Sequence, residues 1–252
     1  ITGEPAFDIG LGDIQMPLNT LDEIFAYLEA ADKPCVVAID EFQQIGTYEE
    51  KNVEALLRSK IQQCKQTVFI FSGSKRHVMS NMFNSSSKPF YQSAISMGLA
   101  PISMEVYADF ATRLFEERGK RIERELVKRV YEAFDGYTWF VQMLMNELFS
   151  MTAHDELCGM DKFETAFRNV VWVQEPSYKE LLSNLSTKQR VLLQAIAKEG
   201  VAKNITSAAF IKKYNLQSAS SVQSALKPLL KHDWVILSEE GYRVYDYFFS
   251  HW

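Results

Sequence analysis

The strongest constraint on the fold is a short apolar run that ends in two acidic residues. Residues 35–39 read Cys-Val-Val-Ala-Ile, and Asp40 and Glu41 follow directly. A continuous apolar run that begins after a proline is typical of a strand buried on both faces, as in a parallel sheet. Open α/β sheets bind their ligands at the carboxyl ends of the strands, so we expect the two acids at a ligand site. The alternative is a buried strand whose acids only enter a solvated loop.

A second apolar run follows at the distance that a crossover connection requires. Residues 67–71 read Thr-Val-Phe-Ile-Phe, and a helical pattern over residues 49–64 separates them from the first run. Strand, helix and strand in this order predict a βαβ unit with parallel strands. Residues 72–74 (Ser-Gly-Ser) then leave the second strand at the same edge as the two acids. The hydroxyl of Ser72 could sense a phosphate there; a plain Ser/Gly turn is the alternative.

The first run and its two acids have the form of a Walker B motif. In such a motif Asp40 holds Mg²⁺, directly or through water, because Mg²⁺ prefers hard oxygen ligands. Glu41 orients or deprotonates the water that attacks the γ-phosphate of ATP. Ser72 would act as the γ-phosphate sensor. The predicted chemistry is therefore ATP hydrolysis, with ATP and Mg²⁺ as the ligands.

These segments resemble a known family. Residues 36–45 (Val-Val-Ala-Ile-Asp-Glu-Phe-Gln-Gln-Ile) resemble the Walker B segment of AAA+/STAND-type ATPases of the archaeal-ATPase family, which are P-loop NTPases, and residues 69–74 resemble their sensor-1 strand. Residues 88–94 lie where that family often has a Leu-Tyr-Gly-Arg-Ala-like segment, and residues 136–138 lie where it often has Gly-x-Pro. The resemblance covers about residues 20–252. It implies an ATPase core whose nucleotide state switches a C-terminal winged-helix module.

One motif of that family is missing from the sequence. No Gly-x-x-x-x-Gly-Lys-Ser/Thr occurs, although this loop supplies the phosphate cradle of P-loop proteins. Only 39 residues precede Asp40, and the chain begins with Ile1 rather than Met. We therefore expect a fragment whose P-loop half has been removed and which is inactive alone. Natural loss of the P-loop is the alternative.

The pattern beyond the second strand is helical and ends in a small separate module. Three helical patterns within residues 188–232 and a hairpin pattern over residues 235–245 predict a winged helix-turn-helix. The predicted domains are the C-terminal part of an AAA+ ATPase core (1–98), a helical lid (99–184) and the winged helix (185–252). The aromatic residues at the end of the chain are expected to pack onto the winged helix. The predicted fold class is α/β plus all-α: a partial P-loop NTPase parallel sheet core, a helical lid and a C-terminal winged helix.

The charge of the chain is unevenly distributed. Residues 1–184 carry 18 Lys and Arg against 27 Asp and Glu, whereas residues 185–252 carry 9 against 5. A basic module with exposed Ser, Gln and Lys on its third helix could bind DNA. Glu239 and Glu240 at the predicted wing tip oppose this, and winged helices also dock proteins. A nucleic-acid-binding regulator and a protein-docking scaffold, each with a degenerate ATPase core, are therefore the alternatives; an oligomer is left open.

Composition excludes several other classes. No apolar run approaches the roughly 18 residues of a membrane span, and no signal-peptide pattern is present. The three cysteines and four histidines show no metal-ligand spacing, so they predict no further metal site. Reduced core cysteines fit a cytoplasmic protein without membrane contact. The basic residues 75–77 could reach a phosphate, but a solvated basic loop is the simpler interpretation.

Overall fold

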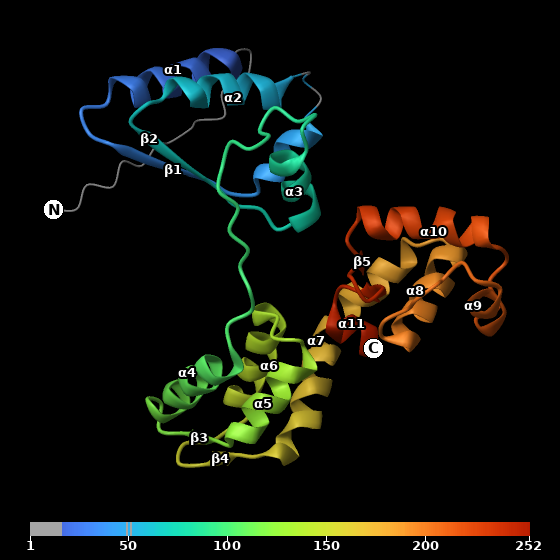
Figure 1. Ribbon diagram of the computed structural model, residues 1–252. Helices are drawn as coiled ribbons and strands as arrows, with labels where there is room; N and C mark the ends of the chain where they lie inside the picture. Colours follow the sequence, from blue (N-terminus) through green and yellow to red (C-terminus); the bar gives the residue numbers. More distant parts are fainter. Residues whose placement is uncertain (1–16, 49, 51) are drawn as a thin grey trace. The chain divides into compact units, whose positions relative to one another are not determined.

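The computed structural model describes residues 17–252, apart from positions 49 and 51. The described residues form two compact units, which meet in the sequence at Gly98 and Leu99. The first unit contains a parallel sheet with helices, and the second is mostly helical (Figure 1). The fold is therefore mixed α/β, as the sequence predicts. No helix in the described part of the chain is both long enough and apolar enough to cross a membrane.

The N-terminal unit is built on one two-stranded parallel sheet. Its elements are α1 (Pro17–Ala30), β1 (Cys35–Ile39), the 3-10 helix η1 (Phe42–Thr47), α2 (Val53–Gln63), β2 (Thr67–Phe71) and α3 (Arg76–Asn84). β1 and β2 pair in parallel, from Cys35 opposite Thr67 to Ile39 opposite Phe71. Because α2 connects these two strands, the predicted βαβ unit is confirmed.

The described residues cover one face of this sheet only. Val37 and Phe69 pack against buried side chains of α1 and partly buried side chains of α2, and the two helices lie on the same side of the strands in Figure 1. On the opposite face, Val36 and Val68 are 67% and 60% exposed, and Ile70 is 52% exposed. The prediction of a strand buried on both faces is therefore wrong for the described part of the chain. Successive side chains of a strand point to opposite faces of the sheet, so every second apolar residue here contacts solvent.

Residues 76–84 form α3 rather than a solvated basic loop. Met82 and Phe83 of α3 are buried against Phe42 and Phe90, and this cluster lies beside the carboxyl ends of the strands. A helix of nine residues is too short for its apolar spacing to be recognised in the sequence. Tertiary packing of its apolar side chains stabilises it instead.

The C-terminal unit consists of a helical lid followed by a smaller module. The lid elements are α4 (Met104–Glu116), β3 (Arg121–Ile122), α5 (Arg124–Ala133), α6 (Thr138–Ser150), β4 (Leu157–Cys158), η2 (Met160–Lys162) and α7 (Phe163–Ser183). The remaining elements are α8 (Thr187–Glu199), α9 (Ala208–Lys213), α10 (Ala219–Lys231), β5 (Val235–Leu237), β6 (Tyr242–Val244) and α11 (Tyr247–His251). The lid helices share one apolar core, and the sequence predicts their helical character but not the short parallel pair β3–β4.

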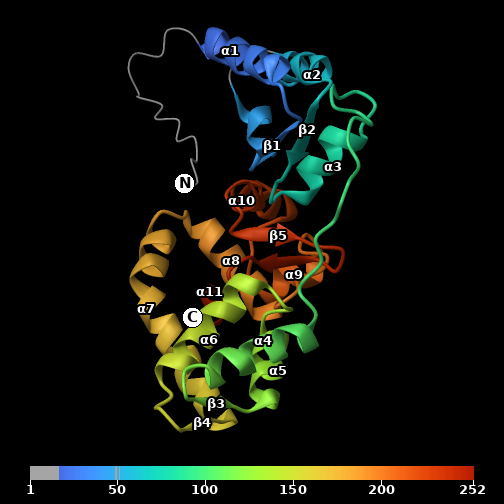
Figure 2. The ribbon, with the colours of Figure 1, turned by 90° about the vertical axis from the view of Figure 1, so that its left-hand side faces the viewer.

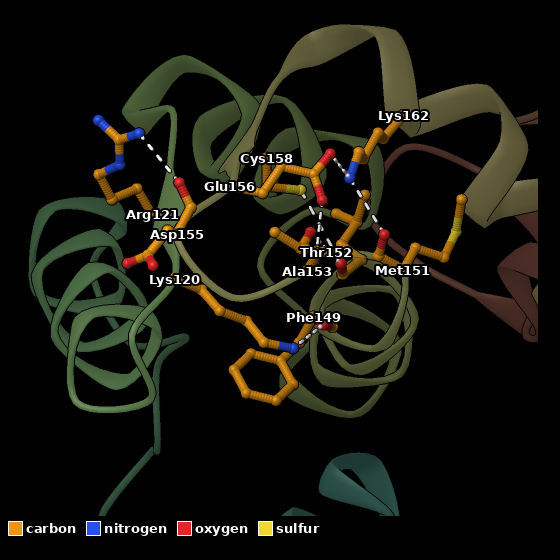
Figure 3. Close-up of polar contacts among 11 residues, drawn as sticks. Lys120, Arg121, Phe149, Met151, Thr152, Ala153, Asp155, Glu156, Cys158 and Lys162 are labelled. Carbon is orange, nitrogen blue, oxygen red and sulfur yellow. Dashed lines mark hydrogen bonds and ion pairs between the residues drawn. The ribbon is translucent and has the colours of Figure 1, made fainter.

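Two lysines close the C-terminal end of α6 (Figure 3). Nζ of Lys120 donates to the carbonyl oxygen of Phe149 at 2.7 Å, and Nζ of Lys162 donates to that of Met151 at 3.1 Å. Lys162 also pairs with Oε1 of Glu156 at 2.6 Å. The lysines donate to carbonyls in the last turn and at the C-cap of the helix and oppose the negative end of its dipole. This network connects the segments that flank β3 and β4 to the end of α6.

Helices α8, α9 and α10 and the hairpin β5–β6 form a winged helix. The strands pair antiparallel, with Val235 opposite Val244, and α10 lies beside β5 (Figure 2). Ser186, Ser207 and Ser218 cap the N-termini of the three helices by accepting a backbone N–H, and such caps fix where the helices begin. The module has its own apolar core, which includes Leu192 and Leu229.

The last helix, α11, joins this module to the lid. Phe248 is fully buried in the apolar core of the lid, with its ring centroid 4.9 Å from that of Phe134 and 6.0 Å from that of Phe140. The neighbouring Phe249 packs against both cores. The expectation that the final aromatic residues pack onto the winged helix is therefore only half correct. The chain returns to the lid, where Phe248 packs among the aromatic rings of Phe134, Phe140 and Phe167.

An ion pair supports the same junction. Nη1 of Arg243 lies 2.9 Å from Oδ2 of Asp135, and the hydroxyl of Tyr247 donates to the same oxygen at 2.6 Å. The guanidinium also lies over the rings of Tyr137 and Tyr247, at 5.2 and 5.0 Å from their centroids. These contacts connect the hairpin to the turn between α5 and α6.

We predict that Phe248→Ala lowers the free energy of unfolding of the C-terminal unit by about 3 kcal/mol, because it removes a fully buried ring and leaves a cavity. Urea unfolding of the 252-residue chain, followed by near-ultraviolet circular dichroism, measures the loss. Phe110→Ala is the matched control, since Phe110 is 41% exposed on α4, and it should cost about 1 kcal/mol. Equal losses in the two variants would contradict the role of α11.

Candidate functional site

The carboxyl ends of β1 and β2 bring the predicted site residues together. Oγ of Ser72 donates to Oδ1 of Asp40 at 2.6 Å, and the backbone N–H of Glu41 donates to the same oxygen at 2.9 Å. Asp40 and Ser72 lie 32 residues apart in the sequence. All three predicted residues are therefore at one edge of the sheet, and Asp40 and Glu41 are exposed there.

Backbone hydrogen bonds hold the two strand ends in register beyond the strands themselves. The N–H of Ser72 donates to the carbonyl oxygen of Ile39 at 3.0 Å, and the N–H of Phe42 donates to that of Ser72 at 2.9 Å. The ring of Phe42 packs 4.3 Å from that of Phe71 and 5.1 Å from that of Phe90, measured between centroids. This aromatic packing anchors η1 directly behind the acids. The acids are thus placed by a buried cluster rather than by a free loop.

Glu41 has two partners that the sequence did not identify. Oε2 of Glu41 accepts from Oγ of Ser74 at 2.9 Å and from Nε2 of Gln43. Glu41 itself has φ of 48°, in the left-handed region that a residue other than glycine rarely adopts. The position of Gln43, two residues after Glu41, was the signal available in the sequence.

The environment of Asp40 favours its charged form. The hydrogen bond from Ser72, with that from the backbone of Glu41, lowers the pKa of Asp40 below its usual value, because both donors stabilise the carboxylate. A charged, exposed carboxylate with a second oxygen available can hold a hard cation such as Mg²⁺. Within the described residues no cluster of three or more His, Cys, Asp or Glu side chains could hold a metal.

The segment 88–94 has a structural role in this unit. Nζ of Lys88 pairs with Oε1 of Glu54 at 3.1 Å, and Phe90 is buried in the aromatic cluster below the acids. Lys88, Glu54 and Gln43 line a cavity of about 170 Å³. The basic residues that follow Ser74 begin α3 and lie in the helix or at its N-cap.

The exposed face of α10 carries the residues expected to meet a partner. Ser218, Ser220, Gln223, Ser224 and Lys227 are exposed. A groove of about 180 Å³ lies between α8 and α10 and is lined by side chains that include Lys188, Leu216 and Ser221. The face is polar and has few cations, and Glu239 and Glu240 follow on the hairpin.

Comparisons with known proteins agree with this architecture. Residues 176–252 match a family described as a probable winged helix domain. The structure is similar to the Walker-type ATPase Paby2304 of Pyrococcus abyssi, with a TM-score of 0.62 and 18% identity over 92% of this chain and 66% of that one. The chain thus spans less than two thirds of the length of that ATPase. No curated protein sequence matches the chain.

Two further structures are more distant. A structure of a Thermotoga maritima RuvB variant matches with a TM-score of 0.47 and 14% identity, covering 91% of this chain and 73% of that one. The Aeropyrum pernix ORC2 protein matches with a TM-score of 0.46 and 15% identity, covering 96% and 67%. These scores are too low to establish a common fold. The similarity to the Pyrococcus protein does show that this chain shares the fold of part of that protein, and the family match shows a winged helix over residues 176–252.

We predict that Ser72→Ala raises the pKa of Asp40, because the hydrogen bond from the hydroxyl stabilises the charged carboxylate more than the neutral acid. A carboxyl NMR titration of the 252-residue chain measures the change. Ser74→Ala is the matched control, since its hydroxyl donates to Glu41, and it should leave the pKa of Asp40 unchanged. An unchanged pKa of Asp40 in Ser72→Ala would show that the hydrogen bond does not persist in solution.

Proposed function

We propose that the intact protein is an ATP-hydrolysing, AAA+/STAND-type ATPase of the archaeal-ATPase kind. The observation that carries the proposal is the hydrogen bond between Ser72 and Asp40, which unites two strand ends at an exposed edge beside Glu41. Two carboxylates and a hydroxyl at the carboxyl edge of a parallel sheet suit the metal, water and phosphate of ATP hydrolysis. The similarity to a Walker-type ATPase fold supports this choice among reactions.

The exposed sheet face supports a larger nucleotide-binding core. Val36, Val68 and Ile70 leave apolar surface in contact with solvent, which is unfavourable for strands of a parallel sheet. The sequence contains no phosphate-cradling Gly-rich loop. Both observations fit a protein in which a further α/β half, carrying the P-loop, covers this face. The 252-residue chain alone should then neither bind ATP tightly nor hydrolyse it.

Each residue has a separate task in the proposed reaction. Asp40 holds the metal, which supplies charge neutralisation on the phosphate oxygens when it is bound. Glu41 orients the attacking water and accepts its proton. Ser72 contacts the γ-phosphate through its hydroxyl and also holds Asp40. Loss of the γ-phosphate then changes the contacts of Ser72, and in this proposal the nucleotide state switches the C-terminal winged-helix module between two arrangements.

We predict that Glu41→Gln in the intact protein lowers the rate of ATP hydrolysis by about 10²–10⁴-fold while Mg²⁺-ATP still binds, because a general base is lost but a polar side chain remains. Asp40→Ala should abolish hydrolysis and weaken the binding of Mg²⁺-ATP. Phosphate release and calorimetry measure the two quantities. Glu23→Gln, at an exposed position on α1, is the control and should behave as the unaltered protein. Near-normal turnover in Glu41→Gln would remove the catalytic assignment.

A second candidate is a nucleic-acid-binding regulator that acts through the winged helix. The exposed Ser, Gln and Lys side chains of α10, on a module with an excess of Lys and Arg, favour it, whereas the acidic hairpin tip favours a docked protein. Such a regulator should bind duplex DNA with an affinity that falls steeply with salt, by about 0.9 logarithmic units per neutralised phosphate. Lys227→Ser should reduce that slope by about one. If the protein does not bind DNA at low salt, the regulator is ruled out and protein docking remains as the function of the winged helix.

A further inference from the structure

One oxygen of Glu41 is occupied by two donors from different segments. Oγ of Ser74 lies 2.9 Å from Oε2, and Nε2 of Gln43 donates to the same atom. Nε2 of Gln43 also lies 3.3 Å from Oγ of Ser74, so the three polar groups form one compact cluster. Within the described residues no hydrogen bond reaches the other oxygen, Oε1. The carboxylate therefore has one fixed oxygen and one available oxygen.

The side chain of Gln43 is held in one orientation. It is only 4% exposed, and its amide nitrogen must face Glu41 because a carboxylate can only accept. Its Oε1 then faces Gly73, where an added Cβ would overlap that oxygen and would lie 2.7 Å from Sδ of Met79. Gly73 thus provides the space that the amide needs. Among the described residues, Oε1 of Gln43 has no hydrogen-bond partner, so the burial of this polar side chain costs free energy. Packing alone does not account for a polar residue at this position.

We propose that Gln43 is a positioning residue for the carboxylate of Glu41, an inference that rests on the proposed ATPase function. Gln43 and Ser74 hold Oε2, so that Oε1 is presented to the attacking water. In the step that follows, the water oxygen bonds to the γ-phosphorus, the bond to the leaving ADP oxygen breaks, and Oε1 takes the proton. Without Gln43 the carboxylate retains one donor and samples other rotamers, which lowers the fraction of correctly oriented base.

The test compares two neighbouring glutamines in the intact protein. Gln43→Leu removes the donor and keeps a similar volume, while Gln44→Leu changes an exposed side chain next to it. We expect Gln43→Leu to lower kcat about tenfold or more and to leave the Kd of Mg²⁺-ATP within about twofold of the unaltered value, because one hydrogen bond to a charged group is lost. Gln44→Leu should change neither quantity. Gly73→Ala should reproduce the loss of kcat, because its methyl group displaces the amide.

A double variant separates positioning from a general structural role. If Gln43 acts through Glu41, then Gln43→Leu added to Glu41→Gln should cause no further loss of the residual rate. An equal loss in both backgrounds, or unchanged kcat in Gln43→Leu, would overturn the inference. Should Gln43→Leu fail to fold, Gln43→Met removes the same donor with a flexible side chain. The proposed function fails separately, through normal turnover in Glu41→Gln.

Discussion

The hydrogen bond from Ser72 to Asp40 is the interaction on which the site depends. It joins the ends of two parallel strands. The two side chains come within hydrogen-bonding distance only because β1 and β2 keep their register up to Ile39 and Phe71. That register is maintained by the aromatic cluster below the edge, in which Phe42 contacts Phe71. A shift by one residue would turn every side chain of a strand to the other face. The apolar cluster therefore determines the geometry of the polar groups above it.

The C-terminal unit depends on a different constraint, the return of the chain to the lid. Phe248 is buried among lid residues, and Arg243 pairs with Asp135, so the end of the winged helix is attached to α5 and α6. Separating these parts would expose an aromatic ring and leave a half-buried guanidinium without its carboxylate, and both changes are costly. The lid and winged helix consequently form one compact unit.

The sequence predicted the features that local patterns encode. The apolar runs identified β1 and β2, and three helical patterns with a hairpin identified the winged helix that the family comparison also recognises. Features that depend on tertiary packing were missed: α3 is short, and the pair β3–β4 has two residues in each strand. The hydrogen bonds of Gln43 and Ser74 could not be predicted either, because they depend on the left-handed backbone of Glu41. The roles assigned to Asp40, Glu41 and Ser72 stay predictions.

The prediction that β1 is buried on both faces is wrong for the described residues, but the reason for the prediction is informative. A strand that is to be solvated on one face usually alternates apolar and polar residues, but residues 35–39 and 68–71 are apolar throughout. Exposed residues such as Val36 and Ile70 do alternate with less exposed ones along the strands. Polar residues, however, do not alternate with apolar ones. An unpaired apolar face also invites association with other chains. The amino acids at Val36, Val68 and Ile70 are therefore those of an interior sheet, although these side chains are exposed among the described residues.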